Sequence, residues 1–433
     1  MRYLKLLFYF TIITGFLGPI LAFRTYPELF AFKIFFLLHA LAFLAYFLRR
    51  RKIEIPIHIR GYFIFFAGWL GWAFLSLLWV DNFADAFRHL TFLLGMTSFI
   101  FFFSFYLKEE KEMVKIYRII FLILVGFSLL GVIETLTGWH LRTSVVGTYN
   151  QAYKLNRPSA VFWNPNDFST YLSLYLPFTL GLMKYKKGLF NKIIGCLLYC
   201  SGLYLVILAE SRANVLAILL GLLVFLVLNW KSESKKTMKT LVILLLIGIV
   251  IIGLLVSLDP ELPFWVKTKT VFAQIYGLPQ ELKEDRGSAY VRGRLIIYGL
   301  RELGRHYLMG VGVGNAEQHM AKYGEDLGGI VNLHNWWLEV LVNYGLIIFL
   351  AYLHFYLSLV KDLLKVIRNS GILRLKMMAE VLTVSLASFS IACIGPSSLL
   401  PQRYMWFLFA LVLAVLNYAK EDISLREEGG RKN

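Results

Sequence analysis

A histidine stands where a long polar, basic segment meets a long apolar one, within the run Asn332–Glu339. We expect His334 in the first turn of a helix, where the helix dipole disfavours the imidazolium form. Arginines nearby would act in the same direction, so the ring would stay neutral and could act as a base. Asn335 is a suitable capping residue, and Trp336 and Trp337 are typical of a membrane interface.

The polar segment before this histidine contains arginines at helical spacing. Arg294, Arg301 and Arg305 recur with Tyr298 along one face of an amphipathic helix that we expect over Tyr290–Met309. A guanidinium group binds phosphate oxygens through two parallel hydrogen bonds. One interpretation is a helix on lipid headgroups with its arginines in water. The other is that at least one arginine faces inward, onto a pyrophosphate.

Two shorter polar stretches between apolar runs offer further candidates. Arg212, which follows Glu210 and a serine, is costly at a membrane edge unless it faces a cavity or a partner. That partner is either Glu210 or a substrate phosphate. Asn166 precedes another apolar run and can cap the helix there. Arg157, just upstream, adds a third basic candidate.

Two other patterns indicate structure and not chemistry. The glycine-rich run Gly310–Asn315 lacks the Lys-Ser/Thr pair of a phosphate-binding loop and the spacing of a dinucleotide motif, so we expect a tight turn. The three cysteines, Cys196, Cys200 and Cys393, lie in apolar runs without a cluster of histidine or aspartate. We predict that they are core residues and that the chain has no metal site.

The apolar content is that of an all-α polytopic membrane protein. Hydrophobic residues make up 58% of the 433 positions, against roughly 45–50% in soluble domains. About twelve runs have the ~20 apolar residues that a membrane span needs. The expected spans are Leu4–Phe23, Leu29–Leu48, Gly61–Val80, Phe87–Leu107, Ile116–Leu136, Asp167–Met183, Leu189–Ala209, Ala213–Trp230, Leu241–Leu258, Asn335–Leu359, Met377–Ile394 and Tyr404–Tyr418.

Lysine and arginine concentrate in alternate loops. If the N-terminus is cytoplasmic, the inside loops contain the basic clusters, including Arg49–Lys52, and the short outside loops hold almost none. The positive-inside rule then places both termini in the cytoplasm and explains most of the net charge of +18. Charges scattered between apolar runs disfavour nucleic acid as a partner. The two longer outside segments are also basic, which an anionic ligand would explain.

These patterns predict four parts. Residues 1–258 would carry spans one to nine, and residues 259–333 an external loop with amphipathic helices. Residues 334–419 would carry spans ten to twelve, and residues 420–433 a cytoplasmic tail.

Five motifs in this order resemble the O-antigen ligase and polymerase superfamily of bacterial membrane glycosyltransferases, which includes teichuronic acid polymerases. The resemblance is strongest from about Arg157 to Leu346. The motifs are Arg157–Asp167, Glu210–Ala213, Gly293-Arg294 with Tyr298, Gly310–Asn315, and His334–Leu338 continuing to Tyr344-Gly345-Leu346. Two positions depart from the usual pattern, since Tyr298 replaces a tryptophan and Ala213 a glycine.

The resemblance implies transfer of a glycan from undecaprenyl pyrophosphate to an acceptor sugar, without metal or cofactor, on the outer face of the cytoplasmic membrane. Arg212 and Arg294 would hold the pyrophosphate, and His334 would act as the base. Arg292 lies close to Arg294 and could be the true partner. Further substrate-binding candidates are Arg157, Asn166, Arg292, Arg301, Arg305 and Asn335. The partners would be the lipid-linked donor, a glycan or glycolipid acceptor, and membrane lipids.

The sequence is also compatible with other functions. Ligases and polymerases of lipid-linked repeat units share these motifs. A transporter of lipid-linked glycans or a membrane scaffold would also need many spans. A transporter should carry ionisable or helix-breaking residues at mid-membrane in paired positions, whereas the charges here lie at the external rim. A scaffold would not need His334.

Overall fold

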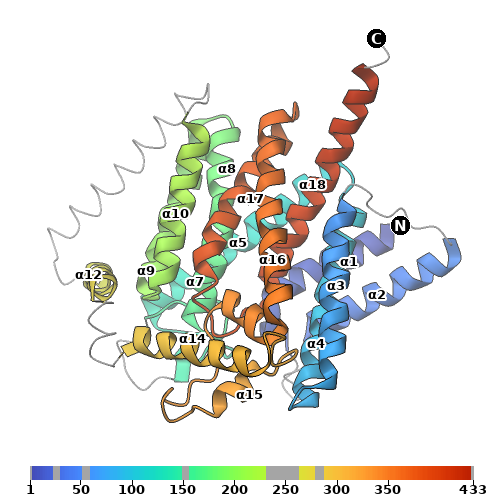
Figure 1. Cartoon of the computed structure of the whole chain (residues 1–433). Helices are drawn as coiled ribbons and strands as arrows, with labels where there is room; N and C mark the ends of the chain where they lie inside the picture. Colours follow the sequence, from blue (N-terminus) through green and yellow to red (C-terminus); the bar gives the residue numbers. More distant parts are fainter. Residues whose placement is uncertain are drawn as a thin grey trace.

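The computed structural model describes residues 2–22, 30–50, 59–148, 156–230, 263–277 and 287–430. Regular structure in these ranges is helical apart from an isolated bridge between Ala22 and Phe30, which confirms the expected fold class. The helices (Figure 1) are α1 (Arg2–Leu17), α2 (Ala31–Arg50), α3 (Arg60–Leu75), α4 (Phe83–Tyr106), α5 (Glu110–Thr137), α7 (Pro165–Tyr175), α8 (Pro177–Tyr185), α9 (Leu189–Leu208), α10 (Arg212–Asn229), α12 (Pro263–Tyr276), α14 (Gly287–Arg305), α15 (Ala316–Ala321), α16 (Trp336–Asn369), α17 (Leu373–Ala392) and α18 (Arg403–Gly430).

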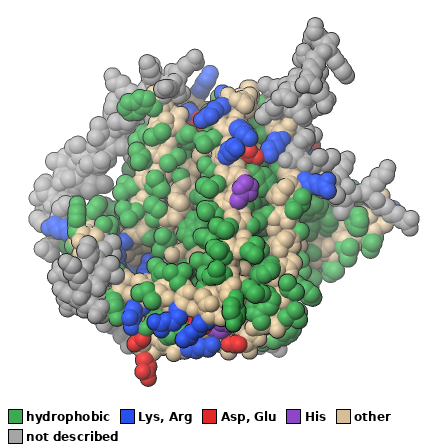
Figure 2. Space-filling model, in the orientation of Figure 1, with side chains coloured by type: hydrophobic (Ala, Val, Ile, Leu, Met, Phe, Trp, Pro, Cys, Tyr) green, Lys and Arg blue, Asp and Glu red, His purple; other side chains and the backbone are tan. Residues whose placement is uncertain are grey.

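Eight of the described helices are long and apolar enough to cross a membrane: α2, α3, α4, α5, α9, α10, α16 and α17. The expected sixth span is divided into α7 and α8 at Pro177, because proline has no N–H for the helical ladder. The ninth expected span, Leu241–Leu258, lies outside the described residues, so the count of twelve stays a prediction. Figure 2 shows a broad apolar surface between two rims where lysine and arginine gather.

Helices α16, α17 and α18 pack together in the interior, with α10, α3 and α4 around them. A Cβ atom at Gly221 of α10 would collide with a serine of α17, so the missing side chain allows these two helices to approach closely. A buried aromatic cluster fixes the centre. Its members are Trp69, Trp336, Tyr352 and Trp406.

Helices α14 and α15 lie across one end of the bundle, opposite the C-terminal end of α18 (Figure 1). Helix α14 buries Leu295, Tyr298 and Leu303 against its neighbours, while Ile296 and Leu300 stay exposed. The apolar residues of this helix are therefore divided between the protein interior and the outer surface.

The run Gly310–Asn315 leads from α14 back to the bundle. The N–H groups of Val311 and Gly312 donate to carbonyls of α16 at 2.8 and 3.0 Å. Helix α16 breaks there at Gly345, which has a φ of 81°. A Cβ atom at Gly345 would lie 2.5 Å from the carbonyl oxygen of Leu308. Because these two N–H groups are occupied by protein carbonyls, the run forms a packing turn and not a phosphate cradle.

Candidate active site

A cavity of about 290 Å³ lies where the segment before α7, the α9–α10 turn, α12, α14 and the α17–α18 turn meet. Four residues predicted from the sequence line it together: Arg157, Asn166, Arg212 and Arg292. We call this space the cation cavity. The rest of its lining consists of Glu210, Ser211, Ala213, Gln274, Ser288 and Gly395.

Arg212 is the first residue of α10 and projects from the helix start into the cation cavity. Its guanidinium donates to the carbonyl of Gln274 at 3.1 Å and to the hydroxyl of Ser288. These contacts connect α10 with α12 and α14. A helix start already favours an anion through its free N–H groups, so a guanidinium at this position strengthens the same preference.

Glu210 fixes two further cations at the cavity edge. Its carboxylate accepts hydrogen bonds from Lys267 at 2.7 Å and from Arg157. Burial raises the pKa of Glu210, but the Lys267 hydrogen bond and the Arg157 charge outweigh it and hold the pKa below its usual value. One carboxylate thus faces Arg157 and Lys267 while Arg212 and Arg292 line the same cavity, which leaves an excess of positive charge for an anionic ligand.

Arg292 approaches the cation cavity from α14. Its Nη1 donates to the carbonyl of Ile394 at 3.0 Å. Burial and the nearby charge of Arg212 lower the pKa of Arg292. Two guanidinium groups that repel each other in a partly dehydrated space are stabilised when an anion binds between them.

His334 lies next to Arg292 and the α17–α18 turn. Its backbone N–H donates to the carbonyl of Ser397 at 3.2 Å, and its φ is +49°. Its Nδ1 is buried and has no hydrogen-bond partner within the part of the chain that the structure describes. Burial, followed by the charge of Arg292, lowers the pKa of His334 to about 4, although the backbone of Gly395 and the next residue acts in the opposite direction.

The start of α16 differs from the sequence expectation in two respects. His334 does not lie in the first turn but directly before Asn335, whose side chain accepts from the N–H groups of Trp337 and Leu338 at 3.1 and 3.4 Å. Trp336 is buried and donates to a tyrosine of α16 at 2.8 Å. The expectation that Trp336 anchors a membrane interface is therefore wrong, because its indole fills the bundle core.

The α17–α18 turn is held against this helix start. Glu339 accepts a hydrogen bond from the Ser398 hydroxyl at 2.6 Å and from the N–H of Leu399 at 3.1 Å. Together with the His334–Ser397 bond, these contacts fix the turn that contributes Gly395 to the cation cavity. Glu339, in the first turn of α16, thus positions the α17–α18 turn next to His334.

Arg294 is not part of the cation cavity. Residues of an α-helix follow one another at about 100°, so Arg294 points about 200° around α14 from Arg292. It forms an ion pair with Asp326 at 3.3 Å and lies 5.1 Å from the ring centre of Tyr298. The structure therefore places Arg292, and not Arg294, with Arg212 and His334.

Arg301 and Arg305 also lie elsewhere on α14. The guanidinium of Arg301 is 5.3 Å from the ring centre of Tyr298. Arg305 donates to Glu302 at 2.7 Å and to the hydroxyl of Tyr323 at 2.8 Å. Neither lines the cation cavity, and a role for them in substrate binding stays a prediction.

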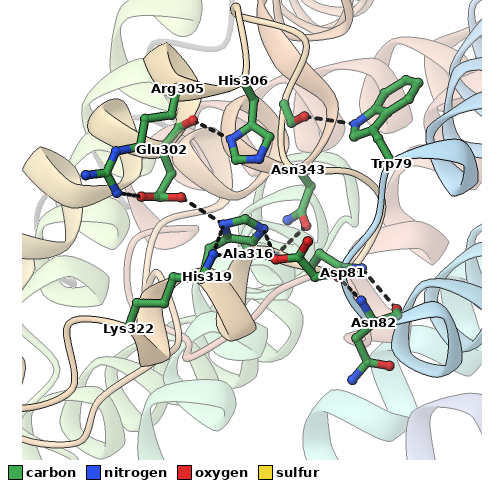
Figure 3. Close-up of polar contacts among 12 residues, drawn as sticks. Trp79, Asp81, Asn82, Glu302, Arg305, His306, Ala316, His319, Lys322 and Asn343 are labelled. Atoms are coloured by element: carbon green, nitrogen blue, oxygen red, sulfur yellow. Dashed lines mark hydrogen bonds and ion pairs between the residues drawn. The ribbon is translucent and has the colours of Figure 1, made fainter.

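A polar cluster joins α14 and α15 to the α3–α4 turn (Figure 3). His319 Nδ1 lies 2.8 Å from Glu302, and its Nε2 lies 3.3 Å from a carboxylate of that turn. Glu302, His306 and His319 are the described group whose ligand atoms are close enough to share a metal ion, within 4.8 Å of one another. Arg305 and Lys322 already contact Glu302 and His319. Two neighbouring cations oppose a metal ion, so we interpret the cluster as a docking contact.

Several residues of the cation cavity are not expected from the sequence. Gln274 contributes a backbone carbonyl and Ser288 a small hydroxyl, and neither has a motif. In the sequence, nothing distinguishes Lys267 from the other basic residues of the long polar segment. The α17–α18 turn does carry a signal, because Gly395, Pro396 and two serines between two spans indicate a structured loop.

The chain is similar in sequence to known proteins. Residues 196–353 match the family model described as O-antigen ligase. The chain is 28% identical over 375 residues to the teichuronic acid biosynthesis protein TuaE of Bacillus subtilis (strain 168), a match that covers 86% of this chain and 74% of that protein. Arg212, Arg292 and His334 fall within the region that matches the family model. The resemblance predicted from the motifs is confirmed.

Proposed function

We propose that this chain, which belongs with the O-antigen ligase and polymerase superfamily, transfers a glycan from undecaprenyl pyrophosphate to a hydroxyl of an acceptor sugar on lipid A-core or a similar surface glycan. The acceptor oxygen bonds to the anomeric carbon of the donor while the bond from that carbon to the pyrophosphate oxygen breaks. Attack from the opposite face inverts the anomeric centre. The acceptor proton passes to His334, and undecaprenyl pyrophosphate leaves.

The observation that carries this proposal is the convergence of Arg157, Arg212 and Arg292 on one cavity with His334 beside it. Pyrophosphate gains negative charge as it leaves, and guanidinium groups fixed around it stabilise that charge without having to reorganise. Arginine suits this role because it stays protonated and offers paired donors. We assign to Arg292 the pyrophosphate-binding role that the family resemblance implies for Arg294.

His334 and Arg292 are coupled through their charges. In the free protein burial, followed by the charge of Arg292, lowers the pKa of His334 to about 4, so the ring is neutral at pH 7. A bound pyrophosphate would offset the charge of Arg292 and thereby raise the pKa of His334 toward its usual value. The histidine would become a stronger base when the donor is present, which suits proton transfer near neutral pH.

The cation cavity faces the exterior of the bacterial cytoplasmic membrane in this proposal. The basic turn after α8 belongs to the end of the bundle opposite α14, and the positive-inside rule assigns that end to the cytoplasm. Both termini would then be cytoplasmic. An external site suits the proposed reaction, because the donor and the acceptor would each be assembled first and would then meet at the cell surface.

Chain elongation is the second candidate, because the similar protein of Bacillus subtilis is named for the biosynthesis of teichuronic acid, a polymer. The chemistry at the cation cavity is the same in both cases. The two activities differ in the acceptor, which is another lipid-linked chain in a polymerase. Product size separates them, since a ligase adds one glycan to each acceptor and a polymerase produces a ladder.

The test uses the full chain in lipid nanodiscs with a glycan on undecaprenyl pyrophosphate and each class of acceptor. We expect transfer that persists in EDTA, a large loss in Arg212→Ala, and no loss in the control Arg88→Ala, which alters an exposed arginine paired with Asp85. Absence of product with every acceptor, or full activity of Arg212→Ala, would contradict the proposal.

A further inference from the structure

A second cavity, of about 440 Å³, lies on the other side of the first turn of α7. Its polar lining includes Arg142, Asp167, Gln402 and Arg403, and Trp163 stands among the apolar residues around it. We call it the outer cavity. Its volume falls within the range of roughly 300–1,000 Å³ that is typical of small-ligand sites.

Two buried polar atoms at the outer cavity lack hydrogen-bond partners among the described residues. Asp167 is 5% exposed, and its Oδ2 accepts from Asn164 at 2.9 Å. Its Oδ1, like the hydroxyl of Thr143, has no partner with hydrogen-bond geometry among the residues that the structure describes, while the side chain of Gln402 interacts with the carboxylate as a hydrogen-bond donor. Buried polar atoms are normally hydrogen-bonded. An unpaired carboxylate oxygen on the wall of a cavity indicates a ligand that carries donors, such as the hydroxyls of a sugar.

The remaining wall combines a fixed cation with an exposed aromatic ring. Arg403 donates from Nε to the carbonyl of Gly15 at 3.1 Å, and its guanidinium lies 4.8 Å from the ring centre of Phe30. Trp163 is 62% exposed, although an indole of this size usually buries most of its surface. An aromatic face next to hydrogen-bonding groups can receive the apolar face of a pyranose ring while its hydroxyls bind the polar groups.

The outer cavity and the cation cavity share their dividing wall. Asn166 lines the cation cavity and Asp167, the next residue, lines the outer cavity. The α17–α18 turn likewise runs from Gly395 at the cation cavity to Gln402 at the outer cavity. Because Asn166 and Asp167 are consecutive residues of α7, the first turn of this helix separates the two cavities.

We propose that the outer cavity is the acceptor subsite and takes a pyranose residue of the acceptor glycan. The inference rests on the proposed function, which places the donor pyrophosphate in the cation cavity. Asp167 accepts hydrogen bonds from the sugar hydroxyls, and Trp163 stacks on the ring. Arg142, exposed at the cavity edge, contacts the part of the acceptor chain that continues outward.

Trp163→Ala is the principal test, because an exposed side chain can be removed with little effect on folding. We expect the acceptor KM to rise about fivefold to tenfold, the usual worth of an aromatic contact, with the donor KM unchanged. Trp139→Ala is the matched control, since Trp139 is 54% exposed in the adjacent loop and does not line the outer cavity. Asp167→Asn keeps the size of the side chain and should raise the acceptor KM in the same way.

Binding without turnover separates this inference from the proposed function. The probe is a set of oligosaccharides released from the producing bacterium's own surface glycan, tagged at the reducing end and added to the full chain in nanodiscs. The wild-type protein and Trp139→Ala should bind the probe and Trp163→Ala should bind it weakly, whether or not transfer occurs. A rise in the donor KM alone, or equal binding of the probe by all three proteins, would overturn the acceptor subsite and leave the donor chemistry intact.

Discussion

Burial, followed by the charge of a neighbouring arginine, lowers the pKa of both Arg292 and His334. The pKa of His334 is lowered to about 4, with burial as the first cause and Arg292 as the second. In the proposed mechanism the neutral ring takes up the proton of the acceptor, so protonation of this ring by acid would stop transfer. A lowered pKa moves that loss of activity toward lower pH.

The pH profile tests this coupling. For the wild-type protein, kcat/KM should be level above about pH 5 and should fall with a midpoint near 4, well below the usual 6.5 for histidine. Arg292→Gln removes the positive charge and should move that midpoint to higher pH, apart from its effect on donor binding. Arg88→Gln should leave the midpoint unchanged. A wild-type midpoint near 6.5, or one that ignores Arg292→Gln, would disprove the coupling.

Arg212 tests recognition of the donor by a guanidinium fork. Arg212→Lys keeps the charge but loses the planar pair of donors and the bridge to Gln274 and Ser288. A charged hydrogen bond contributes about 1.5–3 kcal/mol, so the donor KM should rise about tenfold to a hundredfold. Arg88→Lys, measured in the same assay, should leave the donor KM unchanged. An unchanged donor KM in Arg212→Lys would show that charge alone suffices.

At the scale of elements, the site depends on how α14 is docked. The turn that follows α14 attaches this helix to α16. Gly345 breaks α16 at this contact, and a Cβ atom at position 345 would have no room. The same docking turns Arg292 toward the cation cavity and Arg294 toward Asp326. A shift of this helix would therefore change the charge of the cavity.

Two glycines provide a matched pair for this docking. Gly345→Ala places a Cβ atom against the carbonyl of Leu308 at a φ of 81° and should lower the unfolding free energy by about 1–3 kcal/mol. Gly304→Ala lies within α14 with no atom near the new Cβ and should be neutral or stabilising by up to about 1 kcal/mol. Thermal unfolding in detergent measures both. Equal transition temperatures for Gly345→Ala and Gly304→Ala would show that the α14–α16 contact has room for a Cβ atom at Gly345.

The sequence predicts the helices better than the faces that they bury. Helix α14 and its basic character follow from periodicity, but the choice between Arg292 and Arg294 depends on rotation about the helix axis. That rotation is set by packing onto α16, which is remote in sequence. Trp336 shows the same limit, since a tryptophan next to an apolar run has the same composition whether it lies at a membrane surface or in a core.

At the scale of the whole molecule, the proposed transfer requires the cation cavity to face the exterior of the membrane. A charged rim lies at each end of the apolar surface (Figure 2). Helices α14 and α15 lie at one of the two ends of the bundle. The positive-inside rule assigns the end with the cation cavity to the exterior. The motifs of the sequence are dispersed over more than 170 positions, and only the fold brings Arg157 and His334 to the same end.

Labelling of introduced cysteines tests the orientation. Glu325→Cys lies in the exposed loop beside α15, and Lys187→Cys in the exposed turn between α8 and α9 at the other end of the bundle. A membrane-impermeant maleimide should label Glu325→Cys in intact cells and Lys187→Cys only after permeabilisation. The wild-type protein is the control and measures background labelling of the three native cysteines. The reverse pattern would place the cation cavity in the cytoplasm, away from an external acceptor.

A single-turnover assay of His334→Asn, in nanodiscs with a glycan on undecaprenyl pyrophosphate, tests whether His334 is the base. Asparagine tolerates the positive φ of this position, so the turn should survive the substitution. The donor should still bind, because the arginines are intact, while the rate of transfer should fall by about a hundredfold to ten-thousandfold, the usual contribution of a general base. Transfer at the wild-type rate would show that His334 is not the base and would contradict the mechanism.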